Sequence, residues 1–515
     1  MLNRRSFVAA GASALAMLGS VRVTVGQGWG ATRRSVRGMD ANDPDLAAYR
    51  AAVAAMKALP PSDPRNWNRF ADIHRNFCPH GNWYFLPWHR AYLVALERIC
   101  RQLSGKADFA LPYWDWTAER ELPAAFTAGD PRSNPLNHLR PGFAGGRSLA
   151  DDMVGAEVMS RVLNSPDFEA FGSVRPRGQN STDASWQRRM GAKTEFEFNP
   201  HDGVHLTIGG DMATVEMASR DPIFYLHHSN VDRIWHAWNR RGNDNSPEIL
   251  WQDFAFLRNF THPDGSPWNV AVANLQSTAA LGYQYESDTI GRQHLSGGEA
   301  FAADPVSTAD KAPVTQLIAY RRLMDHDSTQ ANRGLRRIPL PMGGAFHMAS
   351  ADNDRAASRD RPIGISVPLG RPLSELIHPS ALAASNVSTP GARSRRQRVW
   401  ATIRDIDPPS DLNTRLRVFV NCGELSATTD ATNPHYATSV SFFGGGHVHH
   451  RGGHARGMGT SGACVSVDLT PALSRISRTK QFPNDRIVVQ MLPVCPTGTP
   501  TGSNVRPRRV DIAII

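Results

Sequence analysis

The sequence predicts an α+β fold, in which a mainly α-helical domain is followed by a C-terminal β-sandwich or β-barrel domain. Four segments of the first half repeat their apolar residues with the period of an α-helix. From about residue 399, short apolar runs alternate with Pro, Gly, Asn and Asp instead. A length of 515 residues suits two large domains or about three of ~150 residues. With 41% hydrophobic and 20% charged residues, the chain is neither disordered nor fibrous.

The N-terminal segment is typical of an export signal. Arg4 and Arg5 precede an uncharged run that ends at Val21, which is shorter than the ~20 apolar residues of a membrane helix. This pattern resembles a twin-arginine signal. We therefore expect residues 1–37 to form a signal region, cleaved between Val21 and Arg37, of a bacterial protein that is periplasmic or secreted.

Four helices are predicted in the domain that we expect over residues 38–287. The first has an acidic start and stops at a proline pair, and the third and fourth each open with a proline. The predicted helices cover residues 43–59, 66–78, 87–105 and 221–242.

Six short strands are predicted in a C-terminal β-domain over residues 399–515, and their spacing favours a sandwich or barrel. Residues 288–398 mix Gly, Pro and charged residues and are assigned to a linker and uncertain region. The predicted strands cover residues 399–406, 415–422, 438–443, 463–469, 486–494 and 508–515.

Histidine is the residue type that points to chemistry, because seven of the 19 histidines lie in two aromatic-rich clusters. His201 and His205 are four residues apart, so on a helix their Cβ atoms would be ~6 Å apart on one face. This spacing alone is weak evidence for a metal. Six histidines in two sets of three, with no thiolate or carboxylate cluster beside them, suit copper, zinc or iron, and copper binds most tightly in the divalent series. The clustered residues are His74, His80, His89, His201, His205, His227 and His228.

Several motifs resemble those of the type-3 copper family, which comprises tyrosinases, catechol oxidases (polyphenol oxidases) and hemocyanins. These motifs are HxxxCxH, FLPWHRAYL, LPYWDW, PHDGVH, GGDM, DPIFYLHHSNVDRIW and YQY, and they cover roughly residues 60–287. The resemblance implies a four-helix bundle that holds two copper ions per chain. It assigns copper A to His74, His80 and His89, and copper B to His201, His205 and His228. It places His227 outside the ligand set.

The function implied by the resemblance is oxidation of phenols and o-diphenols to o-quinones by dioxygen. The alternatives are a catechol or o-aminophenol oxidase without monophenol hydroxylation, and a hemocyanin-like oxygen carrier. A zinc hydrolase is disfavoured because no Glu lies inside the HxxxH motif.

Further site residues follow from the same resemblance. A thioether is expected between Cys78 and His80, and Val215 matches the position at the entrance of the copper pocket. Glu197 matches a residue that holds a water. Asp202, which follows His201 where relatives carry Asn or Gly, is expected to hydrogen-bond that water and to make it a better base for monophenols. Both monophenol and diphenol oxidation are therefore expected.

The C-terminal domain is expected to keep the enzyme latent until that domain is removed or displaced. The segment YATSVSFFGGGH resembles a loop that places an aromatic side chain over the coppers in long tyrosinases and hemocyanins. Phe442 and Phe443 would alternate across a strand, so only one of them can enter the pocket, and Phe443 is favoured. The loop His447–His454, followed by Met458, is either a transient copper-loading site or a solvated loop.

The charge pattern and the hydropathy of the chain indicate which other classes of partner to expect. The formal net charge is +10, but the arginines do not form a stripe with interleaved aromatics, so no nucleic acid is expected. No segment after the signal is long and apolar enough to span a bilayer. A copper-delivery partner is a further expectation. The arginine-rich run at residues 393–398 is predicted to be an exposed linker and a protease site.

Overall fold

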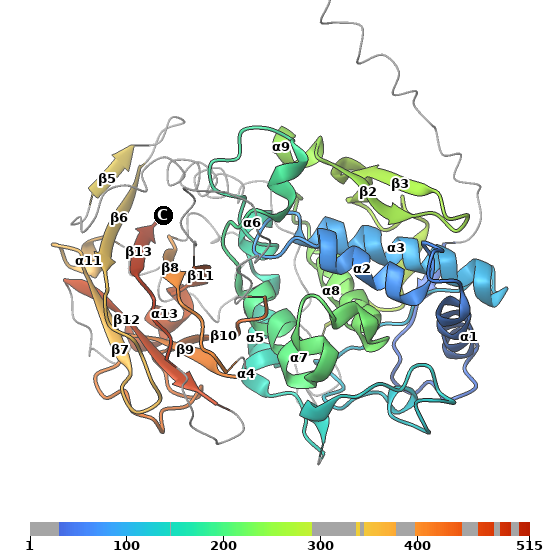
Figure 1. The fold of residues 1–515 in the computed structure, drawn as a ribbon. Helices are drawn as coiled ribbons and strands as arrows, with labels where there is room; N and C mark the ends of the chain where they lie inside the picture. Colours follow the sequence, from blue (N-terminus) through green and yellow to red (C-terminus); the bar gives the residue numbers. More distant parts are fainter. Residues whose placement is uncertain are drawn as a thin grey trace, which may run out of the picture.

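The computed structural model describes residues 30–144, 146–290, 336–339, 345–376, 397–411, 413–444, 462–477, 485–495 and 504–515. The twin-arginine segment, the His447–His454 loop and most of the arginine-rich run lie outside the described residues. In Figure 1 the helical part, coloured blue to yellow-green, lies beside a β-domain coloured yellow to red.

The four predicted long helices are confirmed. Asp43 and Asn66 accept backbone N–H groups at the start of the first two, which caps them. The third ends at Gly105, whose φ of 74° favours glycine. The helices are α1 (Pro44–Ala58), α2 (Trp67–Phe77), α3 (Phe85–Ser104) and α8 (Ile223–Arg240).

Shorter elements complete the helical domain. The α helices are α4 (Asp151–Val154), α5 (Ala156–Leu163), α6 (Phe168–Phe171), α7 (Asp202–Ile208) and α9 (Ile249–Gln252), and β2 (Ala255–Thr261) pairs with β3 (Pro267–Ala271). The 3-10 turns are η1 (Ala124–Phe126), η2 (Pro141–Phe143), η3 (Ala184–Arg188), η5 (Gly210–Ala213), η6 (Ala218–Arg220) and η7 (Val272–Leu275), and η4 (Glu197–His201) is a π-helical turn. Because α3 packs against α1 and α8, a single aromatic-rich core lies between these helices.

The N-terminal boundary predicted at residue 37 is too late. Strand β1 (Ala31–Arg33) pairs in parallel with β4 (Tyr283–Tyr285). The buried Arg33 guanidinium is 2.9 Å from Glu97 Oε2 and 3.2 Å from Asp232 Oδ2. A three-residue strand has no periodicity to detect, so only the tertiary pairing reveals it. A signal cleavage that preserves β1 must fall before Ala31.

The C-terminal domain is a β-sandwich of two sheets that share one apolar core. The first sheet has the order β10-β9-β12-β7 and the second β11-β8-β13-β6-β5, and all their pairings are antiparallel. The six predicted strands are β8 (Val399–Ile406), β9 (Arg415–Val420), β10 (Tyr436–Val440), β11 (Ala463–Asp468), β12 (Arg486–Val494) and β13 (Arg509–Ile514). Helix α13 (Thr470–Ser477) follows β11.

The boundary predicted at residue 399 is also too late. Strands β5 (Arg336–Pro339), β6 (Ala345–Asp352) and β7 (Ile363–Pro368) and helix α11 (Leu373–Leu376) come from the segment that was assigned to a linker. β6 pairs with β13 and β7 with β12, so these strands are part of the sandwich. β5 begins with two arginines and β6 has polar residues among its apolar ones, whereas β7 alternates in the manner of a strand but lies among segments rich in Gly, Pro and charged residues.

The two domains contact each other through backbone and side-chain bonds. The main chain of Lys193 bonds to β11, through Cys464 O at 2.9 Å and Ser466 N at 2.9 Å. Arg415 Nη1 of β9 is 2.9 Å from Asp152 Oδ1. Phe198, which belongs to η4, is buried in the core of the β-domain. The π-helical turn that carries His201 is therefore held by the sandwich.

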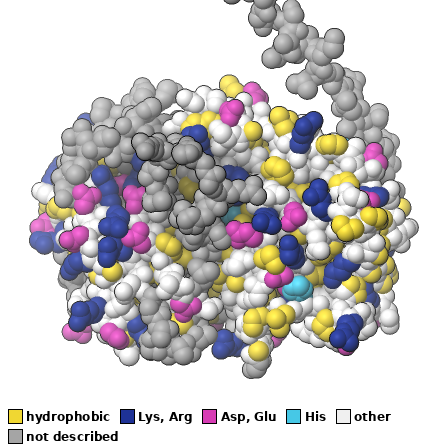
Figure 2. Space-filling view, viewed as in Figure 1, with side chains coloured by type: hydrophobic (Ala, Val, Ile, Leu, Met, Phe, Trp, Pro, Cys, Tyr) yellow, Lys and Arg dark blue, Asp and Glu magenta, His cyan; other side chains and the backbone are white. Residues whose placement is uncertain are grey.

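Among the described residues that Figure 2 shows on this face, Lys and Arg are interspersed with Asp, Glu and neutral side chains. Within the described part of the chain, no helix combines the length and the apolar character needed to cross a membrane.

Candidate metal centre

The structure brings the six predicted histidine ligands together from six segments. α2 carries His74, α3 carries His89 and α8 carries His228, while the turn between α2 and α3 carries His80. His201 ends the π-helical turn η4, and His205 lies one turn later in α7. His80 is half-buried and the other five residues are buried.

The imidazoles form two adjoining groups of three. In the first group, the ring centroids of His74, His80 and His89 are 5.5–5.6 Å apart. In the second, those of His201, His205 and His228 are 4.7, 5.0 and 5.5 Å apart. The His89 and His228 rings stack at 4.2 Å, which joins the two groups. Three converging imidazoles per group match two adjacent metal sites.

Hydrogen bonds at Nδ1 fix the tautomer of three of these rings. The Nδ1 atoms of His74, His89 and His205 are 2.9, 2.8 and 2.9 Å from backbone carbonyl oxygens. A carbonyl oxygen only accepts, so each Nδ1 carries the proton and each Nε2 keeps its lone pair. This is the arrangement in which a carbonyl orients a metal-binding imidazole.

Whether the site fits metal ions depends on the hydrogen-bond partners of the inward Nε2 atoms. Those of His74, His80, His89 and His201 are buried and have no hydrogen-bond partner within the described residues. The Nε2 atoms of His205 and His228 face each other at 3.3 Å. Unpartnered buried acceptors cost about 1–3 kcal/mol each, and one cation bound by each group of three would satisfy them. The donor set therefore fits two copper ions.

His227 also lies within reach of the second group, because His201, His205, His227 and His228 can bring one ligand atom each within 4.8 Å of one another. However, the Trp116 indole N–H donates to His227 Nδ1 at 3.1 Å. An Nδ1 that accepts leaves the proton on Nε2, which then has no lone pair for a metal. This contact favours His228 over its neighbour as the ligand.

Burial keeps the imidazoles neutral, as metal binding requires. It lowers the pKa of His74 to about 3. The pKa of each of His80, His89, His201, His205 and His228 lies well below its ordinary value, also mainly because of burial.

Aromatic side chains form the walls of the site. The Phe224 ring centroid is 4.2 Å from that of His228 and 4.8 Å from that of His74. The Phe85 ring lies 4.7 Å from that of His201. These contacts exclude water from the region between the two groups of imidazoles.

Glu197 and Asp202 are both buried beside the second group. Glu197 accepts bonds from Gly81 N at 2.7 Å and from the Ser173 hydroxyl. Asp202 Oδ1 accepts from His201 Nδ1 at 2.9 Å. Burial raises the pKa of both carboxyl groups, and the ammonium of Lys193 opposes this shift.

Lys193 is a site residue that the sequence reasoning missed. Its Nζ lies 2.6 Å from Asp202 Oδ2 and 3.8 Å from Glu197 Oε1. The two predicted carboxylates thus share a lysine. Lys193 belongs to no recognisable motif, and one of its partners is 250 residues away in the sequence, so only the fold reveals it.

Cys78 lies where the predicted thioether needs it. Its Sγ is 3.6 Å from His80 Nδ1, and burial raises the pKa of the thiol well above its ordinary value. The two side chains are close enough for a bond to form after a small movement.

Phe443 of the β-domain enters the site, whereas Phe442 packs in the core of the sandwich. The Phe443 ring stacks on His205 with centroids 4.1 Å apart and planes at 14°. Both residues follow the end of β10 at Val440, so the chain after the strand separates them, and the expected alternation along a strand does not apply.

Val215 lies at the contact between this loop and the metal site. Its carbonyl oxygen accepts from His74 Nδ1. A Cβ on Gly444 would lie 3.0 Å from Val215 Cγ2, and Gly444 has a φ of 72°. Glycine therefore allows the loop to approach Val215 closely.

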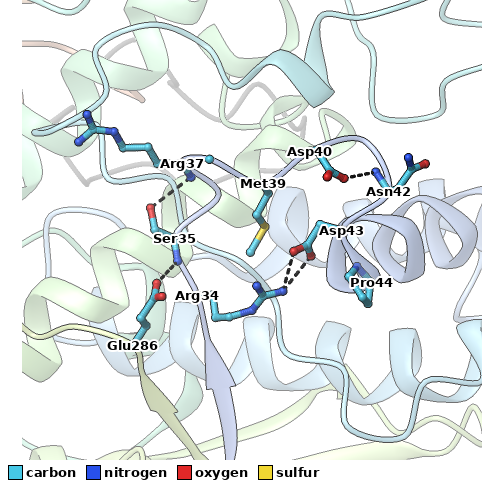
Figure 3. Close-up of a pocket in the computed structure, with 10 residues that line it drawn as sticks. Arg34, Ser35, Arg37, Met39, Asp40, Asn42, Asp43, Pro44 and Glu286 are labelled. Carbon is cyan, nitrogen blue, oxygen red and sulfur yellow. Dashed lines mark hydrogen bonds and ion pairs between the residues drawn. The ribbon is translucent and has the colours of Figure 1, made fainter.

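A separate surface pocket contains none of the histidines. It is lined by the segment around Arg34 and Asp43 and by Glu286 (Figure 3). Arg34 is paired with Asp43 at 2.8 Å, and Glu286 accepts from Ser35 N at 2.9 Å.

Comparison with known proteins matches residues 64–141 and 145–241 to the common central domain of tyrosinase. The chain is 26% identical to the tyrosinase HcTyr1 of Hahella sp. (strain CCB-MM4), over 90% of this chain and 95% of the relative. It is 31% identical to a chloroplastic polyphenol oxidase of Malus domestica over 46% of each chain, so it spans about half the length of that plant relative.

Two solved structures resemble the whole fold. Latent apple tyrosinase has a TM-score of 0.60 at 21% identity, covering 94% of this chain and 98% of that one. A latent aurone synthase (polyphenol oxidase) has a TM-score of 0.61 at 20% identity, covering 95% and 90%. These likenesses concern the arrangement of a helical domain and a β-domain.

The matched tyrosinase domain contains all six converging histidines, and the helices that carry them form the bundle predicted from the sequence. The resemblance extends to a bacterial relative along almost its entire length. Residues 64–141 and 145–241 of this chain thus form a tyrosinase domain, and the chain as a whole is similar to tyrosinases and polyphenol oxidases.

Proposed function

We propose that this protein is a copper-dependent phenol oxidase that converts phenols and o-diphenols to o-quinones with dioxygen. The observation that carries the proposal is the convergence of six inward Nε2 atoms, four of which have no partner within the described residues. Copper bound to His74, His80, His89, His201, His205 and His228 would supply the dioxygen chemistry. The protein contributes fixed imidazoles and a dry aromatic pocket.

The pocket is suited to a phenolic ring. Phe443 shows that a six-membered aromatic ring fits parallel to His205, with the His80 ring 5.5 Å away edge-on. A phenol in this place would have its ring held by stacking, while Phe85 and Phe224 exclude water. Glu197, fixed by Gly81 and Ser173, is the carboxylate placed to hold a water that takes the phenol proton.

The same contact supports latency. While the Phe443 ring stacks on His205, no substrate ring can occupy that place. We propose that the β-domain must move away, or be cleaved off, before turnover. An oxygen carrier with the same histidines is the alternative, and catalytic turnover separates the two.

The experiment measures catechol and monophenol oxidation by copper-loaded protein. His205→Ala should abolish oxidation of both substrates. His138→Ala, which changes a half-buried histidine paired with Asp211 outside the site, is the matched control and should retain activity. Full activity of His205→Ala, or no turnover of any phenol by the copper-loaded wild type after removal of the β-domain, would overturn the proposal.

Export is a second proposal, supported by the Arg4-Arg5 pattern in the sequence. We propose that the chain leaves the cytoplasm by the twin-arginine route, to the periplasm or outside the cell, after a copper-delivery partner has loaded it. Replacing Arg4 and Arg5 together with lysine should retain the protein in the cytoplasmic fraction. Unchanged export of this double variant would contradict the proposal.

A further inference from the structure

Lys193 connects the acidic pair of the site with the residue that closes it. Its side chain is only 8% exposed. Nζ donates to Asp202 Oδ2 at 2.6 Å and to the backbone carbonyl oxygen of Phe443 at 2.7 Å. The ammonium group is therefore directed at the place where Phe443 lies.

Phe443 is bound at two points, the ring and the carbonyl group. Its ring stacks on His205 and its own C=O accepts from Lys193. In any phenylalanine residue, the ring and the carbonyl carbon are separated by Cβ and Cα. A phenolic α-amino acid or a 3-(hydroxyphenyl)propionate has the same two carbons between ring and carboxylate. Phe443 thus occupies the site as such a molecule would.

We propose that Lys193 is a specificity-determining residue, which binds the carboxylate of phenolic substrates that carry two carbons between ring and carboxylate. The inference rests on the proposed phenol oxidation and names its preferred substrate class. When Phe443 leaves, the N–H that bonded its carbonyl is free to donate to the substrate, whose ring replaces that of Phe443 on His205.

The charges around Lys193 set the size of the expected preference. The ammonium of Lys193 already makes a charge-assisted bond to the Phe443 carbonyl, and a carboxylate in its place adds the attraction between opposite charges. Asp202 and Glu197 are close and oppose a further anion, whereas Asp202 also keeps the ammonium in place. We therefore expect a substrate with the carboxylate to be preferred over an uncharged one by about tenfold, in line with one charge-assisted hydrogen bond.

The kinetic test uses the full-length, copper-loaded protein and two catechols, 3-(3,4-dihydroxyphenyl)propionate and the uncharged 4-ethylcatechol. The readout is the ratio of their kcat/KM values, which cancels any general loss of activity or any easier release of Phe443. Lys193→Met should lower this ratio about tenfold, and Lys193→Arg should restore most of it. Lys57→Met also removes a lysine bonded to a backbone carbonyl, Pro135 O at 2.9 Å, and should leave the ratio unchanged.

A binding test is independent of turnover. In the Phe443→Ala background, calorimetry would compare 3-phenylpropionate with its neutral analogue 4-phenylbutan-2-one. Adding Lys193→Met should weaken binding of the acid about tenfold and weaken binding of the ketone less, because the ketone oxygen accepts the same hydrogen bond but carries no charge opposite to that of the ammonium. Equal effects on acid and ketone, or an unchanged kinetic ratio, would overturn the role of Lys193. Absence of phenol turnover together with Lys193-dependent acid binding would instead overturn only the proposed oxidation.

Discussion

Four of the six imidazoles at the metal centre are oriented by a hydrogen bond at Nδ1. Backbone carbonyls hold His74, His89 and His205, whereas a carboxylate holds His201. Asp202 differs from these backbone carbonyls because its carboxylate increases the basicity of the ring that it orients. Its second oxygen is bound to Lys193. These contacts indicate that Asp202 supports the metal site as a whole.

Asp202→Gly should therefore reduce monophenol and catechol turnover together, by about 10- to 100-fold. The cause is that His201 loses the partner of its Nδ1 and Lys193 loses its nearest anion. This differs from the sequence-based expectation that Asp202 selects monophenol hydroxylation. Steady-state rates on a matched monophenol and catechol check it. A loss confined to the monophenol would restore the sequence-based interpretation.

Cys78 and His80 are predicted to be joined by a thioether in the copper-loaded protein. The Sγ atom is already 3.6 Å from Nδ1 of the ring, and the bond would fix the one half-buried imidazole of the site. The proteolytic peptide that contains both residues should be lighter by two hydrogen atoms. Cys100, also buried, is the control that should alkylate after denaturation. Alkylation of Cys78 to the same extent would refute the cross-link.

At the scale of the elements, strand β1 is attached to the bundle by a buried ionic network. Arg33 contacts Glu97 and Asp232, and Arg90 also pairs with Asp232. The hydroxyl groups of Tyr283 and Tyr285 each donate to Asp232 at 2.6 Å. A three-residue strand is thus held by its arginine more than by its two-stranded pairing.

Arg33→Met should lower the free energy of unfolding by about 3–5 kcal/mol, because it leaves buried carboxylates with an incomplete set of partners. Denaturant unfolding of the full chain measures this. Arg34→Met, which removes a 38% exposed arginine from Asp43 and Asp45, is the control and should cost about 1 kcal/mol or less. Equal effects of the two changes would contradict the assignment of β1 to the bundle.

The same network predicts the response of stability to acid. Arg90 and Arg33 lower the pKa of Asp232 against the effect of its burial. The folded-state pKa then lies below the unfolded value of about 3.9, so the stabilisation is complete above that value and disappears as the pH falls through the folded pKa. Arg33→Met should reduce this acid-dependent loss of stability. Unfolding curves between about pH 6 and pH 2, roughly the range in which carboxyl groups titrate, would measure the difference.

Prediction from sequence worked best for elements with a strong local pattern. The capped helices α1 and α2 and the strands β8–β13 have their periodicity within the segment itself. Strands β1, β5, β6 and β7 were missed because their stability comes from distant partners. The six histidines were identified through motif resemblance, whereas Lys193 depends on contacts with β11 and Phe443 that only the folded chain creates.

At the scale of the whole molecule, the two domains meet at the metal site. The loop after β10 places Phe443 on His205, and β11 holds the main chain of Lys193. The turn η4 carries both Phe198, in the sandwich core, and His201, in the metal site. Displacement of the sandwich therefore affects the same segment that positions the second group of imidazoles.

Phe443→Ala should raise catechol turnover by the full-length protein. Removing the ring forfeits about 1.5–3 kcal/mol of burial, which shifts the equilibrium toward the open site by about 10- to 100-fold. Phe442→Ala is the control. The Phe442 ring packs in the sandwich, so its removal should lower the stability of that domain. Unchanged turnover of Phe443→Ala, measured with native folding confirmed by circular dichroism, would contradict the blocking role of the ring.

The position of a proteolytic cut should decide whether the protein is activated. Cleavage between residues 291 and 335 separates the helical domain from all described strands of the sandwich, and should increase catechol turnover. Cleavage in the arginine-rich run at 393–398 falls inside the β-domain, between α11 and β8, and leaves β6 and β7 paired in the sandwich. Activation of the protein by the second cut alone would contradict this division of the domains.

The central claim is that six histidines hold two copper ions per chain, and metal analysis of the purified, copper-loaded protein tests it most directly. We predict two copper ions in the wild type and in His138→Ala, and a loss of bound copper in His74→Ala and His205→Ala, which each remove a ligand from one group. Two copper ions retained in both ligand variants would contradict the account.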